Sequence, residues 1–223
     1  MAQCRAIVLA GGELREPQSL RLRLGGFPAD LVIAADGGAR HAATLGLSLD
    51  AVVGDLDSLS SQIVSDLARL GASIHRHPAD KNEIDLELAL LHAAAAGATE
   101  IVVVGATGAR LDMTLANVML LLHPGVRGTR VELWDGDQTG FVVVPPGGEL
   151  PGAVGDTLSL IPLGGEARGV VTDGLAFPLH GETLAVGPAR GVSNRIVRVG
   201  ARLALDQGAL LVVHTPRAGG GPH

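Results

Sequence analysis

The sequence predicts an α/β domain followed by an all-β domain, and a change of pattern after Trp134 divides the two. Before it, short aliphatic runs alternate with helical segments, which is typical of a mostly parallel sheet with flanking helices. After it, apolar runs are separated by Gly, Pro and Asp turns and no helical periodicity is present. We therefore expect domains at 1–136 and 137–216, with Pro145-Pro146-Gly147-Gly148 forming a turn and 217–223 a flexible tail.

The expected strands of the first domain are short, aliphatic and rich in β-branched residues, as buried parallel strands tend to be. They are Arg5–Ala10, Asp30–Ala35, Asp50–Val53, Ser73–His75, Glu100–Gly105 and Arg130–Leu133. Their alternation with helices predicts a Rossmann-like arrangement.

Two helices of this domain can be placed from their apolar spacing. The first is Glu83–Ala96, with an expected apolar face of Ile84, Leu88, Leu91 and Ala95. The second is Asp112–Leu122, with an expected apolar face of Leu115, Val118, Met119 and Leu122. Asp112 is expected to cap the second helix.

The second domain is predicted to be an antiparallel sandwich or barrel. Its expected strands are Phe141–Val144, Thr157–Ile161, Gly169–Val171, Thr183–Val186, Ile196–Val199 and Ala209–His214.

Composition narrows the class of protein. The 223 residues are 47% hydrophobic and 18% charged, which indicates an ordinary globular chain. A net charge of −6 and an aromatic content of 2% argue against nucleic-acid binding. Cys4 is the single cysteine, which excludes an internal disulfide and favours a reducing compartment. The apolar run after Arg5 is too short for a signal peptide or membrane span, so the cytoplasm is expected.

Two carboxylates follow the third expected strand, in Gly54-Asp55-Leu56-Asp57-Ser58. In extended chain, residues two apart point to the same side, about 6.5 Å from one another. Mg²⁺ is commonly held by one or two carboxylates together with substrate phosphates. The pair therefore indicates a magnesium site, although Asp, Gly and Ser are also common in plain turns.

Polar residues follow the ends of several expected strands, where ligands bind in open α/β sheets. Gly11-Gly12, Asp36-Gly37-Gly38 and the segment from Gly105 to Asp112 follow three strands, and Asp85 begins a helix. Glycines allow backbone N–H groups to approach phosphate, and Arg110 supplies a forked donor. Neither a P-loop nor a Gly-x-Gly-x-x-Gly dinucleotide fingerprint is present in the sequence.

These motifs, in this order, resemble the thiamine pyrophosphokinase family. The resemblance is carried by Asp36-Gly37-Gly38, Gly54-Asp55-Leu56-Asp57-Ser58, the segment from Asp80 to Glu87, Gly105 to Asp112, Leu115-Ala116-Asn117, and Gly191-Val192-Ser193-Asn194. It covers nearly the whole chain. It implies a catalytic domain that binds ATP and Mg²⁺, a thiamine-binding β domain, and a homodimer without nucleic-acid or membrane partners. The implied reaction moves pyrophosphate from ATP to the thiamine hydroxyl and releases AMP.

The resemblance also implies roles for individual residues. Asp55, Asp57 and Asp85 are the expected metal ligands, and Asp57, Asp85 and Asp112 the expected catalytic residues. The expected ATP-binding residues are Gly11, Gly12, Asp36, Gly37, Gly38, Lys81, Gly108 and Arg110. Lys81 is the only lysine, and a solvated loop charge is an equal alternative for it. Ser193 and Asn194 are expected to bind the aminopyrimidine of thiamine.

Three positions depart from the family pattern and leave other functions open. Ile84 replaces a threonine, Met113 a histidine, and Arg195 a residue that is commonly acidic. One alternative is a pyrophosphokinase for another hydroxymethyl heterocycle, such as a pterin. Others are a nucleotidyltransferase, suggested by Leu9-Ala10-Gly11-Gly12, and a nucleotide-binding homologue without catalysis.

The histidines show no metal-ligand spacing. His41, His75, His77, His92 and His123 are therefore interpreted as solvated or helix-surface side chains.

Overall fold

The structure is a computed structural model that describes residues 4–108 and 110–217. The chain forms two compact units that divide after Gly136. Each unit has its own secondary structure and its own core, and each is described separately. Apart from Arg217, the expected tail lies outside the described residues.

The first unit is built on a parallel sheet, as predicted. Its strands are β1 (Arg5–Leu9), β2 (Leu31–Ala35), β3 (Ala51–Gly54), β4 (Ser73–Arg76), β5 (Glu100–Val104) and β6 (Arg130–Asp135). They lie in the order β6-β5-β1-β2-β3-β4, and each neighbouring pair is parallel. Every strand expected from the aliphatic runs is present. Parallel strands end at the same edge of the sheet, so the polar residues that follow them are brought together.

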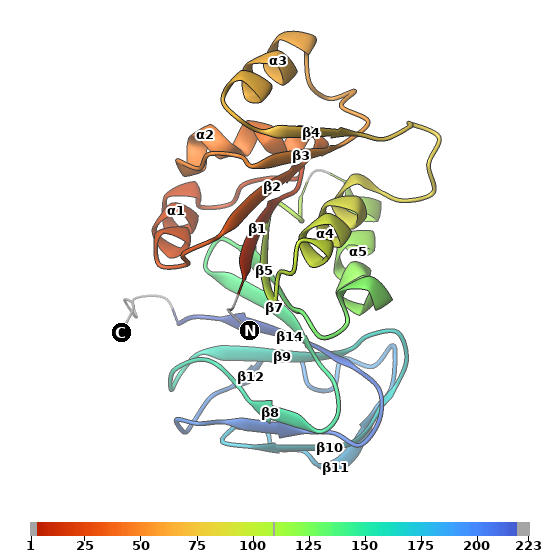
Figure 1. The fold of residues 1–223 in the computed structure, drawn as a ribbon. Helices are drawn as coiled ribbons and strands as arrows, with labels where there is room; N and C mark the ends of the chain where they lie inside the picture. Colours follow the sequence, from red (N-terminus) through yellow and green to blue (C-terminus); the bar gives the residue numbers. More distant parts are fainter. Residues whose placement is uncertain (1–3, 109, 218–223) are drawn as a thin grey trace. The chain divides into compact units, whose positions relative to one another are not determined.

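Helices cover both faces of this sheet (Figure 1). They are α1 (Pro17–Gly25), α2 (His41–Leu45), α3 (Ser61–Arg69), α4 (Asp85–Ala95) and α5 (Leu111–Met119), with 3-10 turns η1 (Asp36–Arg40), η2 (Leu120–Leu122) and η3 (Pro124–Val126). One apolar core lies between the sheet and α4, and a second lies between the sheet and the α1–α2 side.

The predicted apolar face of α4 is confirmed only in part, since Ile84 and Leu88 pack against the core but are only partly buried. The buried residues of α4 are Leu86, Ala89, Leu90 and Ala93, instead of the set that begins at Ile84. Because the helix is apolar on nearly all sides, its hydrophobic spacing fits more than one face. Ala89 and Ala93 are fully buried, and their small side chains let α4 pack close to the sheet.

The predictions for α5 are also corrected. Leu115 and Met119 are 57% and 53% exposed, and the helix buries Asn117 instead. The Asn117 side-chain amide donates to the Ala106 carbonyl at 2.7 Å, so a polar contact turns this face inward. Arg110 occupies the N-cap position without a side-chain cap. Asp112 lies inside the first turn and accepts from the Met113 N–H at 2.9 Å, so it does not cap the helix.

The second unit is a β-sandwich, as predicted. Its strands are β7 (Gln138–Val143), β8 (Gly147–Glu149), β9 (Thr157–Pro162), β10 (Ala167–Asp173), β11 (His180–Leu184), β12 (Asn194–Arg195), β13 (Arg202–Ala204) and β14 (Leu210–Thr215). One antiparallel layer has the order β12-β9-β14-β7 and the other β11-β10-β13-β8, with a shared apolar core. The expected strand Ile196–Val199 is reduced to one bridge between Ile196 and Leu175. The three-residue strands β8 and β13 are too short to leave an apolar run.

Candidate active site

A cavity of about 350 Å³ lies at the carboxyl ends of the first unit's strands. Its lining comes from the loops after β1, β2, β3 and β5 and from the first turns of α4 and α5. Most of the residues that the sequence singled out are in this lining. The topology therefore gathers segments that are far apart in the chain at one polar hollow.

Three carboxylates converge in this cavity. Asp36, Asp55 and Asp57 each present an oxygen within 4.8 Å of the others. Asp36 begins η1 and is buried, while Asp55 and Asp57 follow β3. Between the last two, Leu56 has a φ of 65° and is buried, so the chain turns sharply there. The turn keeps the leucine in the core while both aspartates line the cavity.

Asp85 lines the same cavity and is paired with Lys81. The Lys81 Nζ lies 2.9 Å from Oδ1 of Asp85 and 3.8 Å from Oδ2 of Asp55. Burial raises the pKa of Asp85, and the charges of Asp55 and Asp36 raise it further, although Lys81 opposes the shift. Burial works to lower the pKa of Lys81, but its contacts with Asp85, Asp55 and Asp36 outweigh this and raise it. Lys81 is thus a fixed charge within the acidic cluster, and a solvated loop role is wrong.

The cavity holds polar atoms without hydrogen-bond partners. Among the described residues, the buried side-chain oxygens that accept no hydrogen bond are Oδ1 of Asp36, Asp85 and Asn117. All three residues line this cavity, although Asp85 Oδ1 has its ion pair with Lys81. A buried polar group without a partner typically costs about 1–3 kcal/mol. Oxygens left in this way are suited to a ligand that supplies positive charge.

Gly54 makes this convergence possible. Its φ is +149°, and a Cβ there would lie 2.9 Å from Oδ1 of Asp85 and 3.0 Å from Cβ of Asp36. Any other residue would push these two acids away from the end of β3.

The glycines expected to cradle phosphate differ in the contacts that their backbones make. Gly11, Gly12, Gly37 and Gly108 line the cavity. However, the Gly12 N–H already donates to the Gly105 carbonyl at 2.8 Å, and a Cβ on Gly12 would lie 2.3 Å from the Thr107 oxygen. Gly38 allows η1 to pack against Leu9, whose oxygen would lie 2.1 Å from a Cβ. Gly12 and Gly38 therefore bring backbone segments together.

Arg110 and Asp112 form an exposed pair at the cavity mouth. Arg110 lines the cavity and donates to Asp112 through Nε and Nη2, at 3.1 and 2.6 Å. The Arg110 guanidinium lowers the pKa of Asp112 and the Met113 N–H adds to the effect. Both side chains are well exposed, at 70% and 66%.

Arg40, Ser58 and Asn117 also line the cavity and were not assigned a role from the sequence. Arg40 lies at the end of η1, a turn that no hydrophobic periodicity indicates. The sequence indicated Asn117 only as part of a family motif. Its burial depends on which face α5 turns toward the core.

The second unit holds Ser193 and Asn194. Asn194 is buried, and its amide clamps the Phe177 backbone: Oδ1 accepts from the Phe177 N–H at 3.0 Å and Nδ2 donates to the Phe177 carbonyl at 2.7 Å. Ser193 has a φ of 58°, and its N–H donates to the Ser159 hydroxyl at 3.1 Å. Asn194 thus shapes its neighbourhood through backbone contacts, while the Ser193 residue is exposed.

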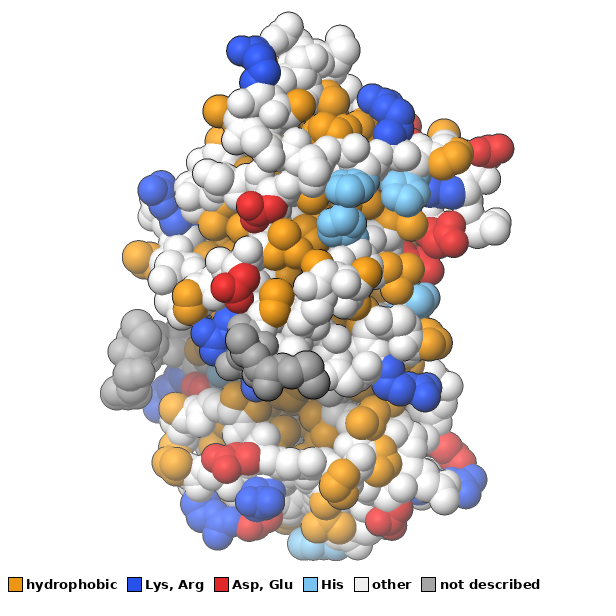
Figure 2. All heavy atoms as spheres, in the orientation of Figure 1, with side chains coloured by type: hydrophobic (Ala, Val, Ile, Leu, Met, Phe, Trp, Pro, Cys, Tyr) orange, Lys and Arg blue, Asp and Glu red, His pale blue; other side chains and the backbone are white. Residues whose placement is uncertain are grey.

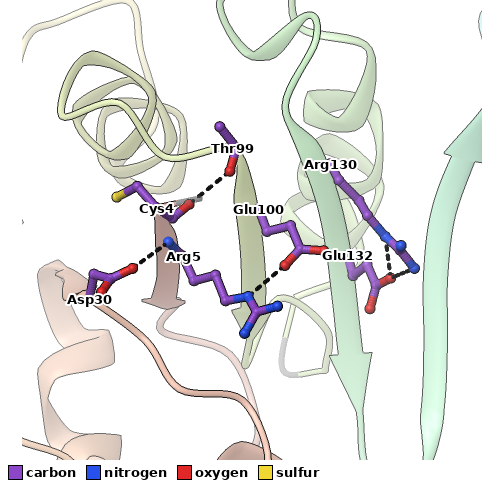
Figure 3. Close-up of polar contacts among 7 residues, drawn as sticks. All are labelled: Cys4, Arg5, Asp30, Thr99, Glu100, Arg130 and Glu132. Carbon is purple, nitrogen blue, oxygen red and sulfur yellow. Dashed lines mark hydrogen bonds and ion pairs between the residues drawn. The ribbon is translucent and has the colours of Figure 1, made fainter. Parts of the chain in front are cut away.

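A second cavity, of about 230 Å³, lies near the opposite ends of the strands. Figure 3 shows the charged groups around it. Arg5 donates to Glu100 at 2.8 Å, and Arg130 donates to Glu132 at 2.9 and 2.6 Å. Since these charged groups are paired with one another, the second cavity lacks the converging carboxylates of the first, and the first is the candidate active site.

Comparisons with known proteins match both units. Residues 28–133 match the model of the thiamin pyrophosphokinase catalytic domain, and residues 149–210 match that of the thiamin pyrophosphokinase vitamin B1 binding domain. The chain belongs to the thiamin pyrophosphokinase family. Together the two models span most of the sequence, as the order of the motifs predicted. A thiamine pyrophosphokinase from Bacillus subtilis (strain 168) is 25% identical over 213 residues, which are 93% of this chain and 97% of that protein.

Solved structures share the fold. The Bacillus subtilis thiamine pyrophosphokinase crystal structure has a TM-score of 0.81 at 22% identity, covering 96% of this chain and 99% of its own. A thiamin pyrophosphokinase family protein from Enterococcus faecalis gives 0.79 at 24% identity, covering 95% and 98%. The yeast thiamin pyrophosphokinase gives 0.79 at 15% identity, covering 96% and 86%.

As a member of this family, the chain is a transferase that makes thiamine diphosphate with ATP as its other substrate. None of the helices in the described part of the chain combines the length and the apolar character that crossing a bilayer requires.

Proposed function

We propose that Asp36, Asp55, Asp57 and Asp85 hold Mg²⁺ against the phosphates of ATP in this cavity. The observation that carries the proposal is the convergence of three carboxylates, among which the buried Oδ1 of Asp36 accepts no hydrogen bond from the described residues. Mg²⁺ prefers carboxylate oxygens and keeps further positions for water and phosphate, so the donor set fits. Asp36 joins the ligands expected from the sequence because η1 brings it beside Asp55.

The bound ion would neutralise phosphate charge at the β-phosphorus, where the hydroxyl attacks, and on the departing AMP. The chain's own contribution is to position the groups. Lys81 offsets the repulsion among the acids and fixes Asp85 and Asp55. Gly37, Arg40 and Arg110 lie along the lining, where an N–H or guanidinium group can meet phosphate oxygens.

We propose Asp85 as the group that accepts the proton of the thiamine hydroxyl. The sequence left Asp57 and Asp85 as alternatives. Asp85 lies in the first turn of α4 and lines the cavity, so its carboxylate can face an acceptor hydroxyl that meets the phosphates there. Asp112 is paired with Arg110 and exposed, so we propose that it holds the arginine in place for the nucleotide.

We propose that the second unit binds thiamine around Ser193. Its hydroxyl is the available side-chain donor of the Ser193-Asn194 pair, since the Asn194 amide is bonded to Phe177. The active form is proposed to be a homodimer, as the family resemblance implies, and light scattering on the purified protein tests this. The single cysteine, Cys4, favours a reducing compartment, and we propose the cytoplasm.

An AMP-release assay tests the proposal. The protein is incubated with Mg²⁺-ATP and thiamine, and in parallel with a pterin alcohol. We expect AMP and thiamine diphosphate in equal amounts, and at least about a 100-fold loss of kcat in Asp57→Asn, the lower end of the range for a lost transition-state charge contact. AMP release with the pterin alcohol but not with thiamine would show that the acceptor substrate is another heterocycle. ATP binding without AMP from either acceptor would instead support a non-catalytic homologue.

A further inference from the structure

The fold brings together histidines that are unrelated by spacing in the sequence. His75 lies on β4 and His92 in the last turn of α4, and their ring centroids are 4.4 Å apart with planes at 56°. His77 follows two residues after His75, on the same side of extended chain. Figure 2 shows histidine side chains gathered on this face of the first unit. The histidines are partly exposed and His92 lies on a helix, as interpreted from the sequence, but the contact between the rings was not expected.

No ion pair accounts for this contact. Among the described residues, the histidines that pair with a carboxylate are His123, with Glu87, and His214, with Asp156. The only hydrogen bond recorded there for either ring joins His75 Nε2 and the Ser73 hydroxyl, at 3.1 Å. Burial lowers the pKa of His92, and the neighbouring His75 and His77 lower it further. Near neutral pH the ring of His92 is therefore uncharged and keeps a lone pair on one nitrogen.

The spacing of the rings suits a shared metal ion. Imidazole nitrogens bind Zn²⁺ at about 2.0–2.1 Å, so the two ligating nitrogens of one ion lie within about 4.2 Å of each other and the rings must be neighbours. The centroid distance of 4.4 Å places the two rings in direct contact, and the side chains lie at a partly exposed surface where small rotations can turn a nitrogen of each toward one ion.

We propose that His75 and His92 form a binding site for a borderline transition-metal dication, such as Zn²⁺, Cu²⁺ or Ni²⁺, with water completing the coordination. Imidazole favours these ions, whereas the oxygen ligands of the active site favour Mg²⁺. The site is thus chemically distinct from the carboxylate cluster. His77 is a third imidazole at its edge.

A metal ion here would link β4, which contacts the Asp55 backbone, to α4, which bears Asp85. β4 is an edge strand of the described sheet, where it pairs with β3. Arg76, between the two histidines of this segment, donates to the Asp55 carbonyl at 2.9 Å, and the His77 N–H donates to the Gly54 carbonyl at 2.8 Å. α4 begins at Asp85. A link between His75 and His92 therefore holds β4 to the helix that bears Asp85.

Electron paramagnetic resonance with Cu²⁺ tests the ligand type directly. One equivalent of Cu²⁺ is added to the full-length protein in excess Mg²⁺, which occupies the carboxylates. We expect hyperfine coupling to two imidazole nitrogens, with a loss of that signal in His75→Gln and in His92→Gln. His180→Gln, at an exposed residue of β11, is the matched control and should leave the spectrum unchanged. A spectrum of oxygen ligands alone in the wild-type protein would overturn the proposal.

Calorimetry with Zn²⁺, again in excess Mg²⁺, measures the affinity. We expect His92→Gln to weaken binding at least tenfold while thiamine-dependent AMP release in Mg²⁺ alone stays at the wild-type level, which shows that the variant is folded. Equal Zn²⁺ affinity in the wild type and His92→Gln would also reject the site.

Discussion

Gly54 controls the distance between acids that come from three segments of chain. A Cβ at this position meets the Asp85 carboxylate and Asp36, at 2.9 and 3.0 Å. We expect Gly54→Ala to separate the acids and to lower both Mg²⁺ affinity and kcat/KM by at least tenfold, or ~1.4 kcal/mol. Mg²⁺ titration by calorimetry and AMP release measure the two effects.

Gly128→Ala is the control for backbone strain. Gly128 also has a positive φ, +87°, but a Cβ there meets nothing within 4 Å. This variant should lose some stability and keep its Mg²⁺ affinity. An equal loss of Mg²⁺ affinity in both variants would show that strain, and not the position of the acids, explains the result.

Lys81 is expected to set the acidic limit of activity. Its ammonium opposes the rise in the pKa of Asp85, so Lys81→Met should raise that pKa further. If Asp85 acts as an ionised group, the acidic limb of kcat/KM then moves to higher pH. Lys81→Arg keeps the charge and should leave the limb near its original position. A pH–rate profile that is the same in all three proteins would remove Asp85 from the catalytic step.

The sequence predicted which acidic residues belong to the candidate site, but not which of them lie together. Asp55, Asp57 and Asp85 were recognised from spacing and family motifs, and all three line the cavity. Asp36 was expected to contact nucleotide, yet its oxygen lies with those of Asp55 and Asp57. That grouping depends on a 3-10 turn and a φ of 40° at Asp36, which no periodic pattern indicates.

Among the elements, the contact of β4 with α4 makes stability depend on pH. The pKa of His92 is lowered in the folded protein by burial and by His75 and His77 on β4, so the unfolded chain takes up its proton first. The stability contribution of the neutral ring is complete above the unfolded pKa of about 6.5 and is lost as the pH falls below it.

We therefore expect the free energy of unfolding to decrease between pH 7.5 and 5, and to decrease less in His92→Gln. Urea denaturation at several pH values measures this, with His180→Gln as the comparison. The same pH slope in His92→Gln as in the wild type would exclude His92 as the source.

Strands were easier to predict than the faces of helices. The aliphatic runs located the inner strands of the first unit because buried parallel strands are apolar on both sides, whereas the edge strand β4 buries no residue. α4 is apolar on nearly all sides, so spacing alone chose Leu88 and Leu91 over the buried Leu86 and Leu90. In α5 the buried residue is Asn117, whose side chain donates to the Ala106 carbonyl. Because this residue is polar, the spacing of apolar residues does not predict that it faces inward.

On the scale of the whole molecule, each unit has a separate apolar core. Leu160 is fully buried in the second unit, and Leu160→Ala should destabilise that unit by about 2–5 kcal/mol. Trp134, the only tryptophan, lies in the first unit and reports its unfolding by fluorescence. We expect the circular dichroism transition to shift while the Trp134 transition shifts much less.

Leu90→Ala, in the core of the first unit, should reverse this pattern and shift the fluorescence transition. Identical shifts of both signals in both variants would mean that the two units unfold as one.

The change of architecture after Trp134 was visible in the sequence because it alters the period of the apolar residues. The strand pairing of the second unit was not visible in the sequence, because β8 and β13 contain three residues each and pair with strands that are distant along the chain.

Arg5, Glu100 and Arg130 occupy one row across β1, β5 and β6. Neighbouring parallel strands are joined by long crossovers, so no tight hairpin fixes how they slide past one another. The alternating charges favour this alignment of the strands, because a shift of β1 by two residues relative to β5 would set Arg5 beside the apolar Val102. Reversing all three charges together would preserve the alternation, whereas exchanging Arg5 and Glu100 alone would set two positive charges side by side on β5 and β6.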